Sequence, residues 1–299
     1  MIVALTGATG FVGRATLAEL LARGHRVRAL TRRQQPPQES VVWVEGSLDR
    51  TDSLERLTEG ADAVLHVAGV VNGSREDFVR GNAEGTRNMI AAARDAGVRR
   101  FVHVSSLAAR EPGLSDYGRS KERAEAAVTA SDLDWSIVRP PGVYGPADGD
   151  MLDVFRMAKL GVMLLPPAGR VSLIHVTDLA RLLVALVGRA GARELYECED
   201  GIVGGLSHHQ LARLIGAAVG RKPLAIALPA AVLKAAARLD RLLRGRSAKL
   251  TPDRASYLSH PDWTADPARR PPPELWTPQV PTPDGLAATA QWYRAEGLL

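Results

Sequence analysis

Ser106, Tyr117 and Lys121 have the residue types and spacing needed for proton transfer. Tyr117 and Lys121 stand four residues apart in a segment with helical periodicity, so they share one helix face. A positive charge beside a phenol lowers its pKa from about 10, because it stabilises the phenolate. Such a tyrosine can act as a general acid or base. Ser105 and Ser106 follow an apolar run at 100–104, where a serine hydroxyl can bond a substrate carbonyl oxygen.

A glycine motif near the start of the chain predicts a nucleotide site. Gly7, Gly10 and Gly13 have the spacing G-x-x-G-x-x-G between a strand-like run at 2–6 and a helical pattern at 11–22. Glycines there allow a tight turn, close approach to a pyrophosphate and close helix packing. The N–H groups at the helix start can then bind phosphate. An ordinary strand–helix turn is the structural alternative, which the alternating context disfavours.

The end of the second strand indicates which dinucleotide binds. Enzymes that prefer NAD usually place Asp or Glu there, to bond the ribose 2′-hydroxyl. Here the sequence reads Thr31-Arg32-Arg33, without a carboxylate. Two guanidinium groups suit a 2′-phosphate, through charge-assisted hydrogen bonds. NADP(H) is therefore the favoured cofactor, with NAD(H) as the alternative.

Strands and helices alternate over the first half of the chain. The expected strands are at 2–6, 26–30, 41–44, 63–67, 100–104 and 135–138, and the expected helices at 11–22, 78–96 and 117–130. This alternation predicts an α/β fold, a Rossmann-like doubly wound parallel sheet with helices on both faces. In such folds ligands bind at the carboxyl edge of the sheet, where the serines and the glycine turn are expected.

The pattern changes after Arg139, which suggests a second region. Further strands are expected at 171–175 and 194–198, and helices at 179–187, 208–219, 230–243 and 286–294, with Thr177 or Asp178 capping the first. We expect a dinucleotide-binding domain at 1–145, to which the chain returns at about 171–198. Residues 146–170 and 199–299 are expected to form a smaller, mostly helical substrate-binding region.

Composition excludes several classes of protein. The 299 residues are 45% hydrophobic and 24% charged, typical of a globular chain. The longest stretch without Asp, Glu, Lys or Arg is Met1–Gly13, too short to span a bilayer, and no signal peptide is visible. A single cysteine, Cys198, cannot form an intramolecular disulfide. These features predict a cytoplasmic protein. The oligomeric state is not indicated, and a homodimer is one option.

The charge pattern does not favour nucleic acid as a partner. The net charge is +5, and long basic runs with interleaved aromatic residues are absent. The densest basic stretch holds Arg238, Arg241, Arg244, Arg246 and Lys249. We interpret it as a solvated helix face; the alternative is that it binds an anionic ligand. No metal site is predicted, since His208 and His209 have no third ligand at a suitable spacing.

Together these motifs resemble the extended short-chain dehydrogenases/reductases, also called the NAD-dependent epimerase/dehydratase family. The matching segments, in chain order, are 6–13, 66–69, 81–86, 104–106, 117–121, 139–146 and 174–178. The resemblance covers residues 1 to about 190, and the rest matches in general layout. Only ten residues separate Ser106 from Tyr117. This short loop is similar to that of atypical subgroups, some of which have lost catalysis.

The resemblance implies roles for individual residues. Tyr117 is implied as the general acid/base and Lys121 as the residue that tunes it and binds the nicotinamide ribose. Ser106 is implied to orient the substrate oxygen, and Asn82 to be structural or to hold a proton-relay water. The implied cofactor contacts are Gly7, Thr9, Gly10, Phe11, Val12, Gly13, Arg32, Arg33, Ser47, Leu48, Val67, Ala68, Gly69, Tyr117, Lys121, Pro140, Gly142 and Val143.

Three hypotheses for function follow. The favoured one is an NADP(H)-dependent oxidoreductase that reduces a carbonyl or oxidises a secondary alcohol. The alternatives are a nucleotide-sugar epimerase or dehydratase, and a non-catalytic NADPH-binding sensor or assembly protein. Ser47 stands where many family members have an Asp that contacts adenine, and this difference favours an exchangeable cofactor over tightly held NAD. The substrate pocket is expected near 143–170 and 201–258, with no substrate indicated.

Overall fold

The computed structural model describes every residue except 190, 192, 246–247 and 249. The chain forms two compact units. The first comprises Met1–Pro140, Val176–Cys198 and Ala268–Thr277, and the second comprises Pro141–His175, Glu199–Pro267 and Pro278–Leu299. No helix among the described residues is long and apolar enough to cross a bilayer.

The first unit is built on a seven-stranded parallel sheet with the order β11-β6-β5-β4-β1-β2-β3. Its strands are β1 (Ile2–Thr6), β2 (Arg26–Thr31), β3 (Val41–Glu45), β4 (Ala63–His66), β5 (Arg100–Val104), β6 (Asp134–Arg139) and β11 (Glu194–Glu197). The chain leaves β1 in one direction to β2 and β3 and then returns to the other side for β4. This reversal makes the carboxyl ends of β1 and β4 the place where ligands bind in such sheets.

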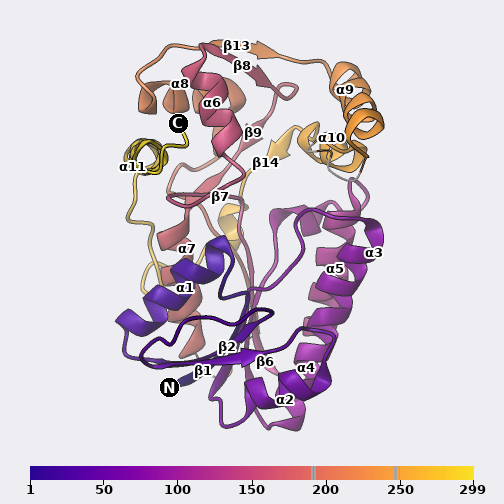
Figure 1. Cartoon of the computed structure of the whole chain (residues 1–299), viewed down its shortest axis with the longest axis vertical. Helices are drawn as coiled ribbons and strands as arrows, with labels where there is room; N and C mark the ends of the chain where they lie inside the picture. The colour runs from indigo at the N-terminus through magenta and orange to yellow at the C-terminus, as the bar shows by residue number, and fades with distance from the viewer. Residues whose placement is uncertain (190, 192, 246–247, 249) are drawn as a thin grey trace. The chain divides into compact units, whose positions relative to one another are not determined.

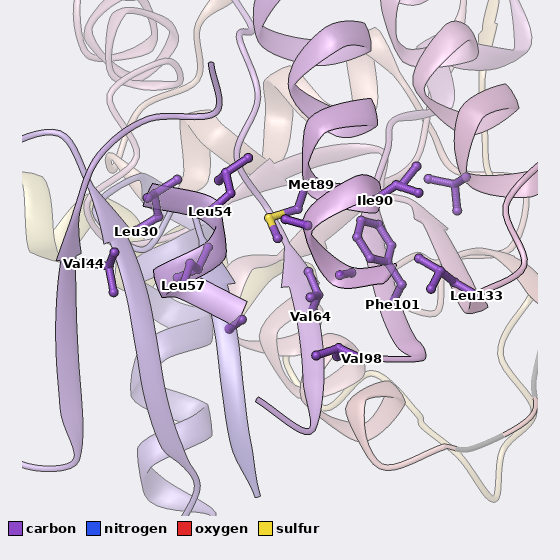
Figure 2. Close-up of a cluster of buried hydrophobic side chains, with 14 of the residues drawn as sticks. Leu30, Val44, Leu54, Leu57, Val64, Met89, Ile90, Val98, Phe101 and Leu133 are labelled. Carbon is purple, nitrogen blue, oxygen red and sulfur yellow. The ribbon is translucent and has the colours of Figure 1, made fainter. Parts of the chain in front are cut away.

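Helices cover both faces of this sheet, as Figure 1 shows. The helices of the first unit are α1 (Phe11–Ala22), α2 (Thr51–Thr58), α3 (Arg75–Phe78), α4 (Gly85–Asp95), α5 (Asp116–Thr129) and α7 (Val176–Val187). Helices α1 and α7 pack against each other, whereas α4 contacts both α2 and α5. Figure 2 shows the apolar cluster between the sheet and α2 and α4, in which Leu54, Leu57, Val64, Met89 and Phe101 are buried.

The Rossmann-like α/β architecture predicted from the sequence is confirmed, and several local expectations need correction. The expected helix 78–96 is divided by a π-helical turn, Val79–Glu84, between α3 and α4. Helix α7 begins at Val176, so Thr177 and Asp178 lie within its first turn and not before it. Helix α2 has no counterpart among the expected elements.

The second unit combines helices with three small sheets. Its strands are β7 (Gly142–Tyr144), β8 (Val162–Leu165), β9 (Arg170–Val171), β10 (Leu173–His175), β12 (Leu206–Ser207), β13 (Leu224–Ala227) and β14 (Asp262–Trp263). Its helices are α6 (Leu152–Lys159), α8 (His208–Ala218), α9 (Ala230–Arg244), α10 (Pro252–Leu258) and α11 (Thr282–Ala295). The core of this unit gathers around Tyr144, Phe155, Ile215, Leu286 and Tyr293.

The two units differ from the division expected from the sequence in three segments. Residues 141–145 were expected in the first unit and belong to the second, where Gly142–Tyr144 forms β7. Residues 268–277 belong to the first unit, where the Trp276 indole N–H donates to the Asp178 carbonyl of α7 at 2.9 Å. Residues 171–175 belong to the second unit, because β10 pairs in parallel with β7. Both contacts join positions far apart in the sequence, so local patterns cannot predict them.

Candidate functional site

The glycine turn between β1 and α1 has the geometry of a phosphate cradle. The Gly10 N–H donates to the Gly7 carbonyl at 2.9 Å, and Gly7 has a φ of +77°. A Cβ atom on Gly13 would lie 1.8 Å from the Gly7 oxygen, so a side chain there would break the turn. Gly10 caps α1 without a side-chain hydrogen bond, which leaves N–H groups at the helix start for an anion. Thr9 and Phe11 complete the turn, and the Thr9 carbonyl accepts from the Arg14 side chain at 3.0 Å.

The segment after β4 lies directly against this turn. A Cβ atom on Gly7 would be 2.7 Å from the Ala68 nitrogen and 3.1 Å from the Val67 carbonyl carbon. The Thr6 hydroxyl accepts from the Ala68 N–H at 3.1 Å and also bonds His66 Nδ1 at 2.8 Å. These contacts fix the edges of β1 and β4 side by side. Val67 and Ala68, which were expected to contact the cofactor, therefore lie beside the glycine turn.

Arg32 and Arg33 lie immediately after β2, on a turn that Thr31 holds. The Thr31 hydroxyl donates to the Arg33 carbonyl at 2.7 Å. Both arginine side chains are exposed. Among the described residues, neither of them forms an ion pair with a carboxylate. Two guanidinium groups at this strand end are thus available to an anionic group.

Ser47 and Leu48 follow β3 and are held by neighbours from two helices. The Ser53 hydroxyl donates to the Ser47 carbonyl at 3.1 Å, and Asn88 donates to the Leu48 carbonyl at 2.8 Å. The Ser47 hydroxyl donates to the carboxylate of Asp49, and this hydrogen bond lowers the pKa of Asp49. A carboxylate is therefore present two residues beyond the position at which the family often has one.

Ser106 lies at the carboxyl end of β5 and begins the 3₁₀ turn Leu107–Arg110. Its hydroxyl accepts from the Ala108 N–H at 3.2 Å. The Leu107 N–H donates to the Pro140 carbonyl at 3.1 Å, which joins this loop to the end of β6. Ser105 is buried, and its hydroxyl has no hydrogen-bond partner among the described residues. Ser106 is thus the serine that reaches the expected active-site residues.

Tyr117 is in the first turn of α5, close to the serine loop. Ser106 hydrogen-bonds the phenol oxygen of Tyr117. The helix can approach the loop because Gly118 has no side chain: a Cβ atom there would lie 2.6 Å from the Ala108 carbonyl oxygen. The aromatic ring packs against Phe78, with ring centroids 5.8 Å apart. The sequence-predicted pair of serine and tyrosine is therefore brought together by a close helix–loop contact.

Lys121 reaches the end of β5 and is surrounded by polar groups. Its Nζ donates to the Val104 carbonyl at 2.9 Å. A Cβ atom on Gly69 would be 3.2 Å from Lys121 Nζ and 3.0 Å from Asn82 Oδ1. Gly69, Asn82 and Lys121 thus converge at the carboxyl edge of β4 and β5, where a larger residue than glycine would displace both polar groups.

Asn82 uses its amide group to tie two elements together. Its Oδ1 accepts from the Val70 N–H at 2.7 Å, and its Nδ2 donates to the Val70 carbonyl at 3.0 Å and to Ser120 Oγ at 2.8 Å. The side chain is almost fully buried. The π-helical turn that contains it places the amide between the segment after β4 and helix α5. This geometry favours a positioning role for Asn82.

Burial dominates the pKa values of the groups at this edge. It raises the pKa of Tyr117, an effect that the Ser106 hydrogen bond opposes. Burial also lowers the pKa of Lys121 to about 8, while nearby Glu125 acts to raise it. The spacing predicted that Lys121 would lower the pKa of Tyr117, but burial and Ser106, and not Lys121, account for the shift. The Lys121 ammonium group donates to the Val104 carbonyl. The i, i+4 spacing places Tyr117 and Lys121 on one helix face, but it does not determine where the lysine side chain points.

Two buried histidines lie behind Lys121. The rings of His66 and His103 stack with centroids 5.5 Å apart. Burial, assisted by the charge of Lys121, lowers the pKa of His66 to about 3, and that of His103 falls well below its ordinary value. Both imidazoles are therefore neutral near pH 7. His66 bonds Thr86 at 3.1 Å through Nε2, which gives it a structural part in holding α4 against β4.

A buried ion-pair network supports α5 from the other side. Arg139 of β6 binds both carboxylate oxygens of Glu125, at 2.8 and 2.6 Å. Glu197 of β11 accepts from Arg139 at 3.4 Å and from Arg110 of the serine loop at 3.2 Å. Such paired and hydrogen-bonded charges hold α5, β6, β11 and the serine loop in one arrangement. The sequence does not predict this network, because its members are far apart in the chain.

The remaining predicted contacts divide between the units. Pro140 ends the first unit and is buried. Gly142 and Val143 belong to β7 of the second unit, where they pair with Leu173 and Ile174 of β10. The described residues contain no group of three or more His, Cys, Asp or Glu side chains that could hold a metal ion.

Known NAD(P)H-binding proteins resemble this chain in sequence and in fold. A model of NAD(P)H-binding proteins matches residues 7–188. The ceramide reductase of Caulobacter vibrioides is 40% identical over all of this chain and 96% of its own length. The sterol demethylase protein B of Methylococcus capsulatus is 35% identical over 50% of this chain and 53% of its own length.

Solved structures share the whole architecture. The human epimerase family protein SDR39U1, crystallised with NADPH, superposes with a TM-score of 0.76 at 21% identity, over 97% of this chain and 99% of its own. At this identity the likeness concerns the fold. The family model over residues 7–188 and the relative that aligns with the whole chain extend the likeness to the sequence. The chain belongs to the NAD(P)H-binding proteins of the extended short-chain dehydrogenase/reductase family, also called the NAD-dependent epimerase/dehydratase family.

Proposed function

We propose that this protein is an NADP(H)-dependent carbonyl reductase whose substrate is a long-chain ketone of the ceramide class. The hydrogen bond between Ser106 and the phenol of Tyr117, at the carboxyl edge of the sheet, is the observation that carries the proposal. It aims a proton donor and a second hydroxyl at the place where this fold binds ligands. Reductases and epimerases both occur among the relatives.

Tyr117 delivers the proton in the proposed reaction. The carbonyl oxygen accepts hydrogen bonds from Ser106 and Tyr117, which polarise the C=O bond. When bound, the reduced nicotinamide supplies the hydride for the carbonyl carbon. As negative charge develops on the oxygen, the Tyr117 proton moves to it, and the product is a secondary alcohol. The charge of Lys121 stabilises the phenolate that remains.

The surrounding residues keep this pair in position. Gly118 allows the close approach of α5 to the serine loop. The bidentate ion pair between Arg139 and Glu125 holds the next turns of α5 against β6. Asn82 fixes the segment after β4, beside Lys121. Catalysis by proton transfer depends on distance, so this fixed arrangement supports an active enzyme more than a non-catalytic sensor.

The proposed preference for NADP(H) rests on Arg32 and Arg33. Their exposed guanidinium groups would bond the 2′-phosphate, while the glycine turn and the start of α1 would hold the pyrophosphate. An acid that would repel the 2′-phosphate is absent from this strand end. Asp49, which Ser47 bonds, is proposed to stand near the adenine in place of the usual family Asp.

The substrate class is proposed from the full-length relative. Ceramide reductase of Caulobacter vibrioides aligns with the whole chain, so the similarity includes the second unit as well as the sheet. A ceramide carries a secondary hydroxyl, and the oxidised form of such a group is a ketone. Reduction of that ketone is the reaction that Ser106 and Tyr117 are arranged to assist.

The proposal is tested by following NADPH absorbance with purified protein. The substrates to compare are an N-acylated long-chain 3-keto base, a short water-soluble ketone and UDP-glucose. We expect NADPH consumption equal to the alcohol formed, fastest with the long-chain ketone. Isomerisation of UDP-glucose without net NADPH use would contradict the proposal, as would NADPH binding without turnover of any carbonyl compound.

A further inference from the structure

The outer face of the two-stranded sheet in the second unit is apolar and exposed. Strands β8 and β13 pair in parallel, with Val162 opposite Leu224 and Leu164 opposite Ile226. These four side chains are exposed, whereas the alternate residues, such as Met163, face the core of the unit. A sheet with one solvated face normally carries polar residues on it. An exposed apolar face of this kind indicates an interaction surface.

Helix α9 follows β13 directly and has a second exposed apolar face. Leu233 and Ala237, one helical turn apart, are buried against α10 in a small cluster with Ala255. Leu242 and Leu243 are 82% and 75% exposed on the side away from that cluster. Figure 1 shows β8, β13 and α9 at one end of the second unit.

The exposed apolar face is a continuous stripe along α9. Val232, Leu239 and Leu243 are spaced by seven and four residues, so they share one side of the helix. Val232 and Leu239 are about half exposed, and Leu243 more so. On a wheel with 100° per residue, the centre of the stripe lies about 120° from the two buried residues of the helix. Helix α9 thus buries one narrow face and leaves a wider apolar face without a partner in this unit.

Positive charge occupies one side of α9, between its buried residues and the exposed Leu242. On the helical wheel Arg238 lies next to Leu242, and Lys234 and Arg241 lie between Arg238 and the buried residues. They have no carboxylate partner among the described residues, whereas Arg244 pairs with Asp240 at 3.3 Å. Residues 221–258 hold nine Lys or Arg and two Asp or Glu, a net charge of +7. The whole chain carries +5, so all of its positive excess lies in this segment.

We propose that α9, together with the outer face of β8 and β13, is a docking surface for an anionic phospholipid bilayer. The leucines of the stripe enter the boundary between headgroups and acyl chains, and Lys234, Arg238 and Arg241 contact the phosphates. An exposed apolar face with cations along its flank is the pattern of a helix that lies in the membrane interface. The protein is thereby a peripheral membrane protein, held at the surface without a spanning helix.

Charge favours this occupant over a second copy of the chain. A two-fold dimer through α9 would bring the same cationic flank of each copy close to the other, which repels. An anionic bilayer instead neutralises the three cations while covering the leucines. The inference does not depend on the proposed reductase activity, since binding to lipid is measured without turnover.

The experiment is co-sedimentation of the full chain with vesicles. One set is phosphatidylcholine alone, and the other contains about 30 mol % phosphatidylglycerol, which gives an anionic surface. We expect strong binding to the anionic set, and weak binding to the neutral set or at high salt. The variant Leu239→Glu/Leu243→Glu should bind at least about tenfold more weakly, because two apolar side chains leave the interface. Arg238→Glu/Arg241→Glu should lose the preference for anionic lipid.

Val42→Glu is the matched control for the leucine variant. Val42 lies on β3 of the first unit and is 54% exposed, against 55% for Leu239, so it introduces one glutamate at the exposure of Leu239. The single variant Leu239→Glu is the direct comparison, because it makes the same change in charge. It should bind vesicles like wild type, and all variants should reduce a water-soluble ketone at the wild-type rate. Equal binding of wild type and Leu239→Glu/Leu243→Glu would overturn the proposal. A second outcome would also overturn it. In that outcome the wild type is a dimer by light scattering and does not bind vesicles, and Leu239→Glu/Leu243→Glu is a monomer.

Discussion

Gly118→Ala tests whether the contact between α5 and the serine loop sets the rate of proton transfer. A Cβ atom at this position would lie 2.6 Å from the Ala108 carbonyl oxygen, where an ordinary contact starts at 3.4 Å. The helix and the loop must therefore separate by about 0.8 Å, because the obstacle is backbone. Tyr117 moves with the helix and Ser106 with the loop. A misplacement of this size costs on the order of 10–100-fold in kcat.

The assay compares kcat, the Kd for NADPH and the melting temperature of wild type and Gly118→Ala. We expect kcat to fall by about 10–100-fold. Affinity for NADPH should fall less than kcat, because the glycine turn at 7–13, Arg32 and Arg33 lie outside α5. The fold should persist, because Gly118 does not have a positive φ and alanine can adopt its backbone conformation.

Gly113→Ala is the matched control, since a Cβ atom there meets nothing within 4 Å. It makes the same chemical change in the loop that leads to α5, and it should leave kcat at the wild-type value. A Gly118→Ala protein with wild-type kcat would refute the reasoning. Equal losses in the two variants would refute it too, because the loss would then not arise from the close contact.

Three further predictions concern the cofactor, pH and the positioning residue. Arg32→Ala/Arg33→Ala should raise the Kd for NADPH at least about tenfold and leave that for NADH unchanged, by fluorescence titration; equal effects on both would contradict the 2′-phosphate assignment. Between about pH 8 and 10.5 the unfolded chain holds the Lys121 proton more tightly than the folded chain. The free energy of unfolding of wild type should therefore rise with pH there relative to Lys121→Met, in urea titrations, and parallel curves would contradict the lowered pKa. Asn82→Ala should cost about 2–4 kcal/mol of stability, because it leaves buried groups unpaired, and the exposed Asn88→Ala less than about 1 kcal/mol; equal losses would argue against a positioning role.

The sheet and the order of the site residues could be predicted from the sequence. Short apolar runs at 2–6 and 100–104 coincide with β1 and β5, and the pattern at 11–22 coincides with α1. These elements carry a clear local signal, because strands of a parallel sheet are buried on both faces. Their shared carboxyl edge follows from the parallel order, so Ser106 was expected near the glycine turn.

The details that position the site could not be predicted in the same way. The π-helical turn at 79–84 depends on the bonds of Asn82 to Val70 and Ser120, which are distant in the sequence. The ion pair of Arg139 with Glu125 joins a strand to a helix. Periodicity describes which face of one element is apolar, and it carries no information on such pairings.

Most strands of the small sheets in the second unit were not predicted, for a related reason; the expected strand at 171–175 coincides with β10 and the end of β9. Strands β9, β12 and β14 have two residues each, too few for a period of two to be visible. They are defined by pairing, as when Leu206 pairs with Val171. The exposed leucines of α9 were also hidden, since the sequence pattern does not distinguish a helix face that packs from one that stays open.

The central claim is that Tyr117 protonates a carbonyl oxygen while NADPH is consumed. It is tested most directly by measuring alcohol formed and NADPH oxidised, in the same reaction, for wild type and Tyr117→Phe. The account predicts equal amounts of both with wild type. It also predicts a kcat about 10²–10⁴-fold lower for Tyr117→Phe, with the Kd for NADPH unchanged. A Tyr117→Phe protein that reduces the ketone at nearly the wild-type rate would contradict the claim.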